Sequence, residues 1–255
     1  PGLPQRFNEI NEGVDDLGSI TPTLANVELL LQIDPDVIVS ANSMGDFSKP
    51  LETIGPVVIL THLDSWKEVM LFGSNLIDER QVAEALLAEY EMRVQILQAQ
   101  FEDPSEITIS YVRLFPESAH VQLSDSFARQ IMQDVGFSFP EAQLELVESA
   151  PNEIEADFSA ERIDLIDGDY LFLYGAQPDQ LLENAGTSAE TLVEAFQNDP
   201  LFQALEVAKA NQVYETDLHW SVPGIYSAHA VLDDLFRHVA GVDPEEVAPN
   251  PLSLE

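Results

Sequence analysis

The sequence of 255 residues contains no cysteine, which excludes disulfide bonds, thiol catalysis and cysteine-based metal sites. It also lacks any apolar run of the roughly 18 or more residues that a membrane-spanning helix needs. The first ten residues, PGLPQRFNEI, have neither the basic nor the apolar region of a signal peptide. We therefore expect no signal sequence within this chain, whose length suffices for a substantial core and two lobes.

Basic residues are scarce, since 10 lysines and arginines face 46 aspartates and glutamates and give a net charge of -36. Such a surface repels phosphate backbones, so we expect no direct partner among nucleic acids or anionic membrane faces. The simplest interpretation is that the acidity keeps the protein soluble. It could also favour docking onto a basic partner protein.

The common catalytic motifs are absent, including phosphate-binding glycine loops, the nucleophile elbow and the paired histidines of zinc peptidases. The five histidines, at positions 62, 120, 219, 229 and 238, are scattered without metal-ligand spacing. We therefore expect no catalytic residue, no cofactor and no metal ion bound directly by the protein.

A fifteen-residue pattern occurs twice, at residues 26–40 (NVELLLQIDPDVIVS) and 159–173 (SAERIDLIDGDYLFL). Each copy places a glutamate, Glu28 or Glu161, where we expect a helix N-terminus that favours negative charge. Each copy then has a proline or glycine between two aspartates, which ends the helix before a buried strand. The repeat predicts two similar lobes, although many helix-to-strand crossovers share this pattern.

The clearest predicted helix covers residues 78–101 and would be about 36 Å long, enough to join two lobes. Only two strands precede it, at residues 37–40 and 57–60. Two strands do not form a stable, covered parallel sheet. We therefore expect that the chain starts partway into its first lobe, or that this lobe is reduced.

Strands and helices alternate after the long helix. The predicted elements are a strand at 107–112, a helix at 126–135 stopped by Gly136, a strand at 170–173, a helix at 187–197, a strand at 213–216 and a helix at 226–240. This alternation predicts a parallel, doubly wound α/β sheet. The predicted organisation is a first lobe over residues 1–77, a connecting helix over 78–102 and a second lobe over 103–255.

Four passages in this order resemble one protein family. They are residues 18–39; the strand 109–113 followed by Ser126, Phe127 and Gly136; residues 159–173; and a closing passage with Ala208 to Ala210, Val213, Tyr214, Trp220, Gly224 and the run Leu-Asp-Asp-Leu at 232–235. Together they resemble the substrate-binding proteins of iron-siderophore ABC importers, which share their fold with periplasmic cobalamin and haem binders. The resemblance covers about residues 18–241.

The resemblance implies two Rossmann-like α/β lobes joined by one long helix, with the ligand held in the cleft between them. It implies a monomeric, extracytoplasmic receptor that binds a ferric siderophore, performs no chemistry and delivers its ligand to an ABC transporter permease. The family normally has a further strand-helix-strand unit before the position that matches Gly18. Because most of that unit is absent here, the first lobe departs from the family pattern.

Glu28 and Glu161 match the family's two glutamates, one on each lobe, which pair with arginines of the permease. Two carboxylates at a fixed spacing would let docking report whether the cleft is open or closed. The alternative is that each carboxylate only complements its own helix dipole, an effect of about 0.3 to 1 kcal/mol.

Arg113 and Trp220 are the main candidate ligand contacts. Arg113 ends a predicted strand, and open α/β sheets bind ligands at the carboxyl ends of their strands. Its guanidinium suits the oxygens of a ferric chelate, although it could instead form a structural ion pair. Trp220 lies in a polar loop and could form a cleft wall, or could be a core tryptophan.

Further candidate contacts follow from their positions near the expected cleft. They are Tyr226, His219, Trp66, Asn42, Ser43 and Met44. A cobalamin or haem receptor of the same fold is an alternative, in which His219 or Tyr226 would be the candidate axial ligand of a haem. A doubly wound α/β enzyme or a structural interaction domain remains open as a different class.

Overall fold

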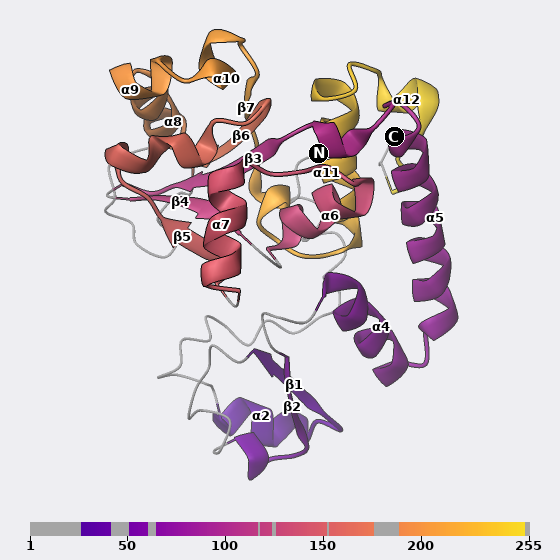
Figure 1. Cartoon of the computed structure of the whole chain (residues 1–255). Helices are drawn as coiled ribbons and strands as arrows, with labels where there is room; N and C mark the ends of the chain where they lie inside the picture. Colours follow the sequence, from indigo (N-terminus) through magenta and orange to yellow (C-terminus); the bar gives the residue numbers. More distant parts are fainter. Residues whose placement is uncertain are drawn as a thin grey trace. The chain divides into compact units, whose positions relative to one another are not determined.

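Figure 1 shows the computed structural model, which describes residues 27–41, 51–60, 65–116, 118–123, 126–151, 153–175 and 189–252. The chain forms two compact units, Pro1–Val69 and Met70–Glu255. Both units combine parallel strands with helices, so the predicted α/β class is confirmed.

The described part of the first unit is a small strand-helix arrangement. Helix α2 spans Val27–Ile33, and strands β1 (Ile38–Ala41) and β2 (Val57–Leu60) pair in parallel. The chain leaves α2 through Asp34, whose φ of 51° lies in the left-handed region, and Pro35 then prevents the helix from continuing. The two strands lie within one residue of their predicted positions.

The long predicted helix is shorter than expected. Helix α5 spans Arg80–Gln98, and its 19 residues make a rod about 28 Å long. Asp78 has a φ of 59° and lies before the helix, whose N-cap residue is Glu79. A separate helix, α4 (Trp66–Leu76), precedes it. The role of residues 78–102 as a connector between lobes stays a prediction.

Helix α5 packs inside the second unit against α6 (Phe127–Val135) and α11 (Ile225–His238). Its buried side chains follow helical spacing and include Tyr90 and Leu97, each with no exposed surface.

The second unit is built on a five-stranded sheet of order β5-β4-β3-β6-β7 (Figure 1). The strands are β3 (Ile109–Leu114), β4 (Ala119–Gln122), β5 (Glu155–Asp157), β6 (Tyr170–Gly175) and β7 (Val213–Glu215).

The sequence predicted a purely parallel sheet, but this sheet is mixed. Strands β3, β6 and β7 are parallel, whereas β4 is antiparallel to both β3 and β5. Only residues 115–118 connect β3 to β4, and Phe115 N–H donates to Ser118 O across this turn at 2.8 Å. So short a connection can make a hairpin but not the crossover that a parallel pair needs.

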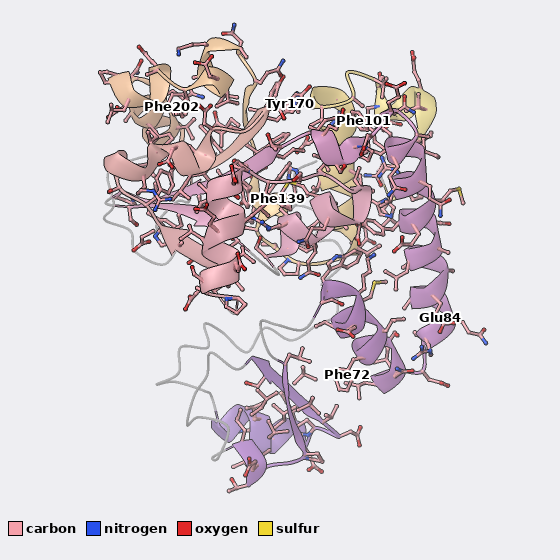
Figure 2. All side chains as sticks on the ribbon, viewed as in Figure 1. Phe72, Glu84, Phe101, Phe139, Tyr170 and Phe202 are labelled. Atoms are coloured by element: carbon pink, nitrogen blue, oxygen red, sulfur yellow. The ribbon has the colours of Figure 1, made fainter. Side chains whose placement is uncertain are left out.

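Helices cover the sheet on both faces. Besides α5, α6 and α11, the second unit contains η2 (Pro104–Glu106), α7 (Glu141–Ser149), η3 (Ala160–Ile166), α8 (Ala189–Gln197), α9 (Pro200–Gln203), α10 (Glu206–Lys209), η4 (Leu218–Trp220) and α12 (Pro244–Val247). On one face, alternate residues of β3 and β6 pack with η3, α8 and α9. This apolar cluster includes Val112, Leu114, Leu171, Leu173, Leu165, Val193 and Phe202, the last labelled in Figure 2.

Two glycines occupy positions that other residues would strain. Gly136 ends α6 with a φ of 94°, and its N–H donates to Met132 O and Gln133 O, as the predicted helix stop requires. Gly168 lies between η3 and β6, where a Cβ atom would come within 2.9 Å of Thr108 O. The second copy of the repeat therefore has its predicted break, although its helix is a 3₁₀ helix.

A buried polar network fastens α5 to α11 and to the chain after α12. Arg93 donates to His229 O at 3.1 Å and to Ala248 O at 2.9 Å, and it pairs with the carboxylate of Asp233. Its Nη1 also lies 3.0 Å from His229 Nδ1. Asn250 donates to the other Asp233 oxygen at 2.9 Å. The network holds three segments that are distant in sequence.

We predict that Arg93→Met lowers the free energy of unfolding by about 3 to 5 kcal/mol, because it leaves the Asp233 carboxylate buried without its guanidinium. The control is Arg80→Met, which removes an exposed pair with Glu84 and should change stability by at most about 0.5 kcal/mol. Urea unfolding followed by circular dichroism measures both. Similar losses in the two variants would contradict the prediction.

The imidazole of His229 gives a pH-dependent prediction. Burial, aided by the positive charge of Arg93, lowers the pKa of His229 from 6.5 to about 3. Between these values the unfolded chain binds a proton that the folded chain does not. The stabilisation is therefore present above pH 6.5 and is lost as the pH falls toward 3.

We predict that His229→Gln makes the unfolding free energy less dependent on pH between 6 and 4, by about 1.4 kcal/mol per pH unit relative to the unchanged protein. Denaturant unfolding at several pH values measures the two slopes. Equal slopes would show that His229 is not neutral in the fold.

Candidate ligand-binding site

Four polar side chains form a single row across the second unit's sheet. The strand register pairs Asp157 of β5 with His120 of β4, His120 with Arg113 of β3, and Arg113 with Tyr174 of β6. Directly paired residues point to the same face of a sheet, so these four side chains, the polar row, lie together. The row lies near the carboxyl ends of β3 and β6, where open α/β sheets bind ligands.

Arg113 is partly exposed and only weakly paired. Its side chain is 30% exposed, and its Nη1 lies 3.5 Å from Glu155 Oε2. The guanidinium carbon lies 5.2 Å from the ring centroid of Phe115. Its Nε is buried, and no residue in the described ranges accepts a hydrogen bond from it. A buried donor without an acceptor is unfavourable, whereas the exposed part of the guanidinium side chain can meet an oxygen ligand.

Glu155 and His120 lie beside Arg113, and Asp157 lies beside His120. Gln122 Nε2 donates to Glu155 Oε2 at 2.8 Å, which orients this carboxylate. His120 lies between the two acids, with Nδ1 3.3 Å from Glu155 Oε1 and Nε2 2.9 Å from Asp157 Oδ1. Arg113 is therefore positioned by an acidic group that is itself held by neighbours.

Tyr174 completes the row on its other side. Burial raises the pKa of Tyr174, and the Asp217 carboxylate raises it further, whereas the charge of Arg113 opposes both effects. Its phenol thus stays protonated at neutral pH and can donate a hydrogen bond to a ligand.

A second row, the aromatic row, lies on the same face of the sheet, two residues earlier along β3 and β6 than the polar row. The register pairs Tyr111 with Phe172, and Phe172 with Tyr214. Trp220 stacks on Phe172 with ring centroids 4.3 Å apart and lies 5.2 Å from the ring of Tyr111. Its indole N–H donates to Asp234 Oδ2 at 2.8 Å. The aromatic row therefore lies next to the polar row on the same face of the sheet.

Trp220 is only 1% exposed. The sequence predicted a cleft wall, but the indole packs in the core because Phe172 and Tyr111 give it aromatic partners and Asp234 satisfies its N–H. This is the alternative that the loop's sequence left open.

The remaining candidates on the second unit flank Trp220. His219 Nε2 lies 2.7 Å from Asp234 Oδ2, and the His219 side chain is 16% exposed. Tyr226, in the first turn of α11, is 37% exposed. Both side chains therefore keep some surface that a ligand can reach.

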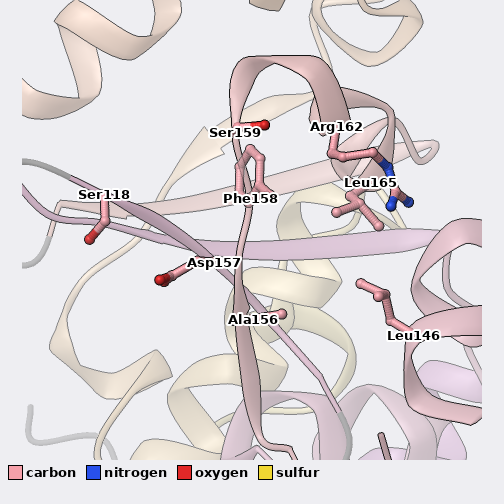
Figure 3. Close-up of a pocket in the computed structure, with 8 residues that line it drawn as sticks. All are labelled: Ser118, Leu146, Ala156, Asp157, Phe158, Ser159, Arg162 and Leu165. Atoms are coloured by element: carbon pink, nitrogen blue, oxygen red, sulfur yellow. The ribbon is translucent and has the colours of Figure 1, made fainter. Parts of the chain in front are cut away.

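A separate cavity of about 590 Å³ lies beside β5 and η3 (Figure 3). Its lining combines apolar and polar side chains: Leu146, Ala156, Phe158, Leu165, Ser118, Asp157, Ser159 and Arg162. Arg113 does not line it, so this cavity and the polar row are different features that share Asp157 at their border.

Metal-ligating side chains do not gather in groups of three or more anywhere in the described ranges. Within the same residues, none of the helices combines the length and apolar character needed to cross a bilayer.

Residues 8–218 match the family described as periplasmic binding protein. The chain belongs to this family. Its members are binding proteins and not enzymes, so the prediction that this chain performs no chemistry is confirmed.

Two relatives of this periplasmic binding protein have informative names. The probable siderophore-binding lipoprotein YfiY of Bacillus subtilis is 27% identical over 88% of this chain and 68% of its own length. The achromobactin-binding periplasmic protein of Dickeya dadantii is 27% identical over 90% of this chain and 73% of its own length.

A solved structure has the same fold. SirA of Staphylococcus aureus, crystallised with staphyloferrin B, superposes with a TM-score of 0.73 at 20% identity, covering 84% of this chain and 75% of SirA.

The candidates outside the polar row fall in different parts of this periplasmic binding protein. Glu28 and Glu161 are the second residues of α2 and η3, as the repeat predicted, and their side chains lie outside the described part of the structure. Trp66 begins α4 and is 4% exposed, so most of its surface is packed. Residues 42–44, which contain Asn42, Ser43 and Met44, lie outside the described residues.

Sequence reasoning found Arg113 but missed its companions. His120, Glu155, Asp157 and Tyr174 belong to the row or touch it, and none was a candidate. The strand β5 has only three residues, too few to give a readable alternation. A polar-apolar alternation in the four residues of β4 was the one available signal, and it does not reveal the partner strands.

Proposed function

We propose that this chain binds a ferric siderophore outside the cytoplasm and delivers it to the permease of an ABC importer. The observation that carries the proposal is the polar row, in which Arg113 presents a 30% exposed, positively charged side chain near the carboxyl edge of the sheet. The names of the family and of two relatives support a periplasmic or lipid-anchored receptor for such a ligand. We propose that it acts as a monomer.

Arg113 is the principal contact in this proposal, because ferric chelates present anionic or strongly polar oxygens that a guanidinium can bind through two hydrogen bonds. Tyr226 and His219 are the next contacts, since each keeps some exposed surface. Asn42, Ser43, Met44 and Trp66 are the contacts proposed for the first lobe. The iron is wrapped by the small molecule and has no protein ligand.

We predict that Arg113→Ala weakens binding of the ferric ligand by about 1.5 to 3 kcal/mol, the usual value of a charged hydrogen bond. A fluorescence titration against ferric hydroxamate, catecholate and citrate-type chelates, with cyanocobalamin and hemin as further ligands, measures it. Arg80→Ala is the control, because Arg80 is half-exposed and pairs with Glu84 on helix α5 of the same unit.

Unchanged affinity in Arg113→Ala would assign Arg113 a purely structural role. If cyanocobalamin or hemin bound saturably and no ferric chelate bound, the ligand would be cobalamin or haem and not a siderophore.

Glu28 and Glu161 are the proposed docking residues. Each lies in the first turn of its helix, where a carboxylate can face a basic partner surface.

We predict that the double variant Glu28→Ala, Glu161→Ala binds ligand normally but no longer supports iron uptake, because the permease loses both carboxylates. Uptake of labelled ferric chelate by cells that lack their own copy measures this. The matched control is Glu141→Ala with Glu245→Ala, which removes first-turn carboxylates from α7 and α12. Normal uptake by the docking variant would refute the assignment.

A further inference from the structure

The second unit has few positive charges to offer a ligand. Its seven basic residues are Arg80, Arg93, Arg113, Arg129, Arg162, Lys209 and Arg237, and all seven lie in described ranges. Two of them, Arg93 and Arg129, are buried and make structural contacts. Arg93 is held by the network around Asp233, and Arg129 donates to Gln143 Oε1 at 3.0 Å with its guanidinium 3.4 Å from the ring centroid of Phe139.

Four more of these residues pair with carboxylates close to them in sequence. The pairs are Arg80 with Glu84 at 2.6 Å, Arg162 with Asp164 at 3.4 Å, Lys209 with Glu206 at 2.7 Å and Arg237 with Asp234 at 3.7 Å. None of these four belongs to the polar row. Among the arginines and lysines of this unit, Arg113 alone faces the candidate site.

The site around Arg113 is itself acidic. Glu155 pairs with the guanidinium of Arg113, and Asp157 pairs with His120 at the end of the polar row. The Asp217 carboxylate, just after β7, raises the pKa of Tyr174. Three carboxylates thus surround one arginine and one histidine. Even with His120 protonated, the negative charges in this group outnumber the positive charges.

The first unit is also poor in basic residues. Its basic residues are Arg6, Lys49 and Lys67, and the whole chain carries a net charge of -36. A highly anionic ligand would approach an unfavourable field and meet unfavourable charges at the site.

Ferric siderophores differ sharply in charge. Three hydroxamates carry one negative charge each and balance the three charges of ferric iron, so the complex is neutral apart from its substituents. Three catecholates carry two negative charges each, so their ferric complex has a net charge of minus three.

We propose that this receptor takes a ferric chelate with little or no net negative charge, of the hydroxamate type, and discriminates against triscatecholates. The inference rests on the proposed function and narrows its ligand class. Arg113 then binds one polarised hydroxamate oxygen, while Glu155 and Asp157 repel chelates with excess negative charge.

Calorimetric titrations of the full chain with ferrioxamine B and with ferric enterobactin, at low and high salt, test the proposal. We expect ferrioxamine B to bind at least about ten-fold more tightly at low salt, because several unfavourable charge pairs oppose the triscatecholate. Salt should reduce this difference, since it screens charges beyond a few ångströms.

The variant Asp157→Asn removes one negative charge without changing side-chain size. It should improve binding of ferric enterobactin by about five-fold at low salt, the effect of one nearby unit charge. Glu84→Gln, on the exposed face of α5, removes an equal charge elsewhere and should leave both affinities unchanged (Figure 2).

The outcomes separate this inference from the proposed function. Binding of ferric enterobactin as tight as that of ferrioxamine B, or no gain in Asp157→Asn, would overturn the ligand class and leave a siderophore receptor. Failure of every ferric chelate to bind would overturn the proposed function itself.

Discussion

The hydrogen-bonded register of β3 is the constraint on which the candidate site depends. This strand pairs with β4 on one side and with β6 on the other, so Arg113 has His120 and Tyr174 as direct neighbours. A shift of one residue would turn Arg113 toward the apolar cluster and place Val112 or Leu114 in the polar row. The buried residues on the opposite face oppose such a shift, because Val112 and Leu114 would then lose their packing.

The aromatic row beside the polar row is held by contacts with the loop that contains Trp220. Trp220 stacks on Phe172, and Tyr111 shares a 2.6 Å hydrogen bond with Ser221 in the same loop. Asp234 accepts from the indole of Trp220 and lies within reach of His219, so α11 holds the loop against the sheet.

The distribution of charge connects stability with ligand choice. A chain with only 10 basic residues uses two arginines, Arg93 and Arg129, to hold buried polar networks together. Several others pair with nearby acids on the surface. In our proposal, the few cations that remain limit how much negative charge a ligand can bring.

The α/β class, the positions of most strands and helices, the breaks at Gly136 and Gly168, and the family could all be read from the sequence, because these features depend on local periodicity and on short motifs. The sequence also indicated Arg113 through its place at a strand end. The antiparallel direction of β4, the burial of Trp220 and the grouping of His120, Glu155 and Asp157 with Arg113 became visible only in the folded chain. Those features depend on which strands pair and in what register, and residues distant in the chain set that pairing through long-range packing.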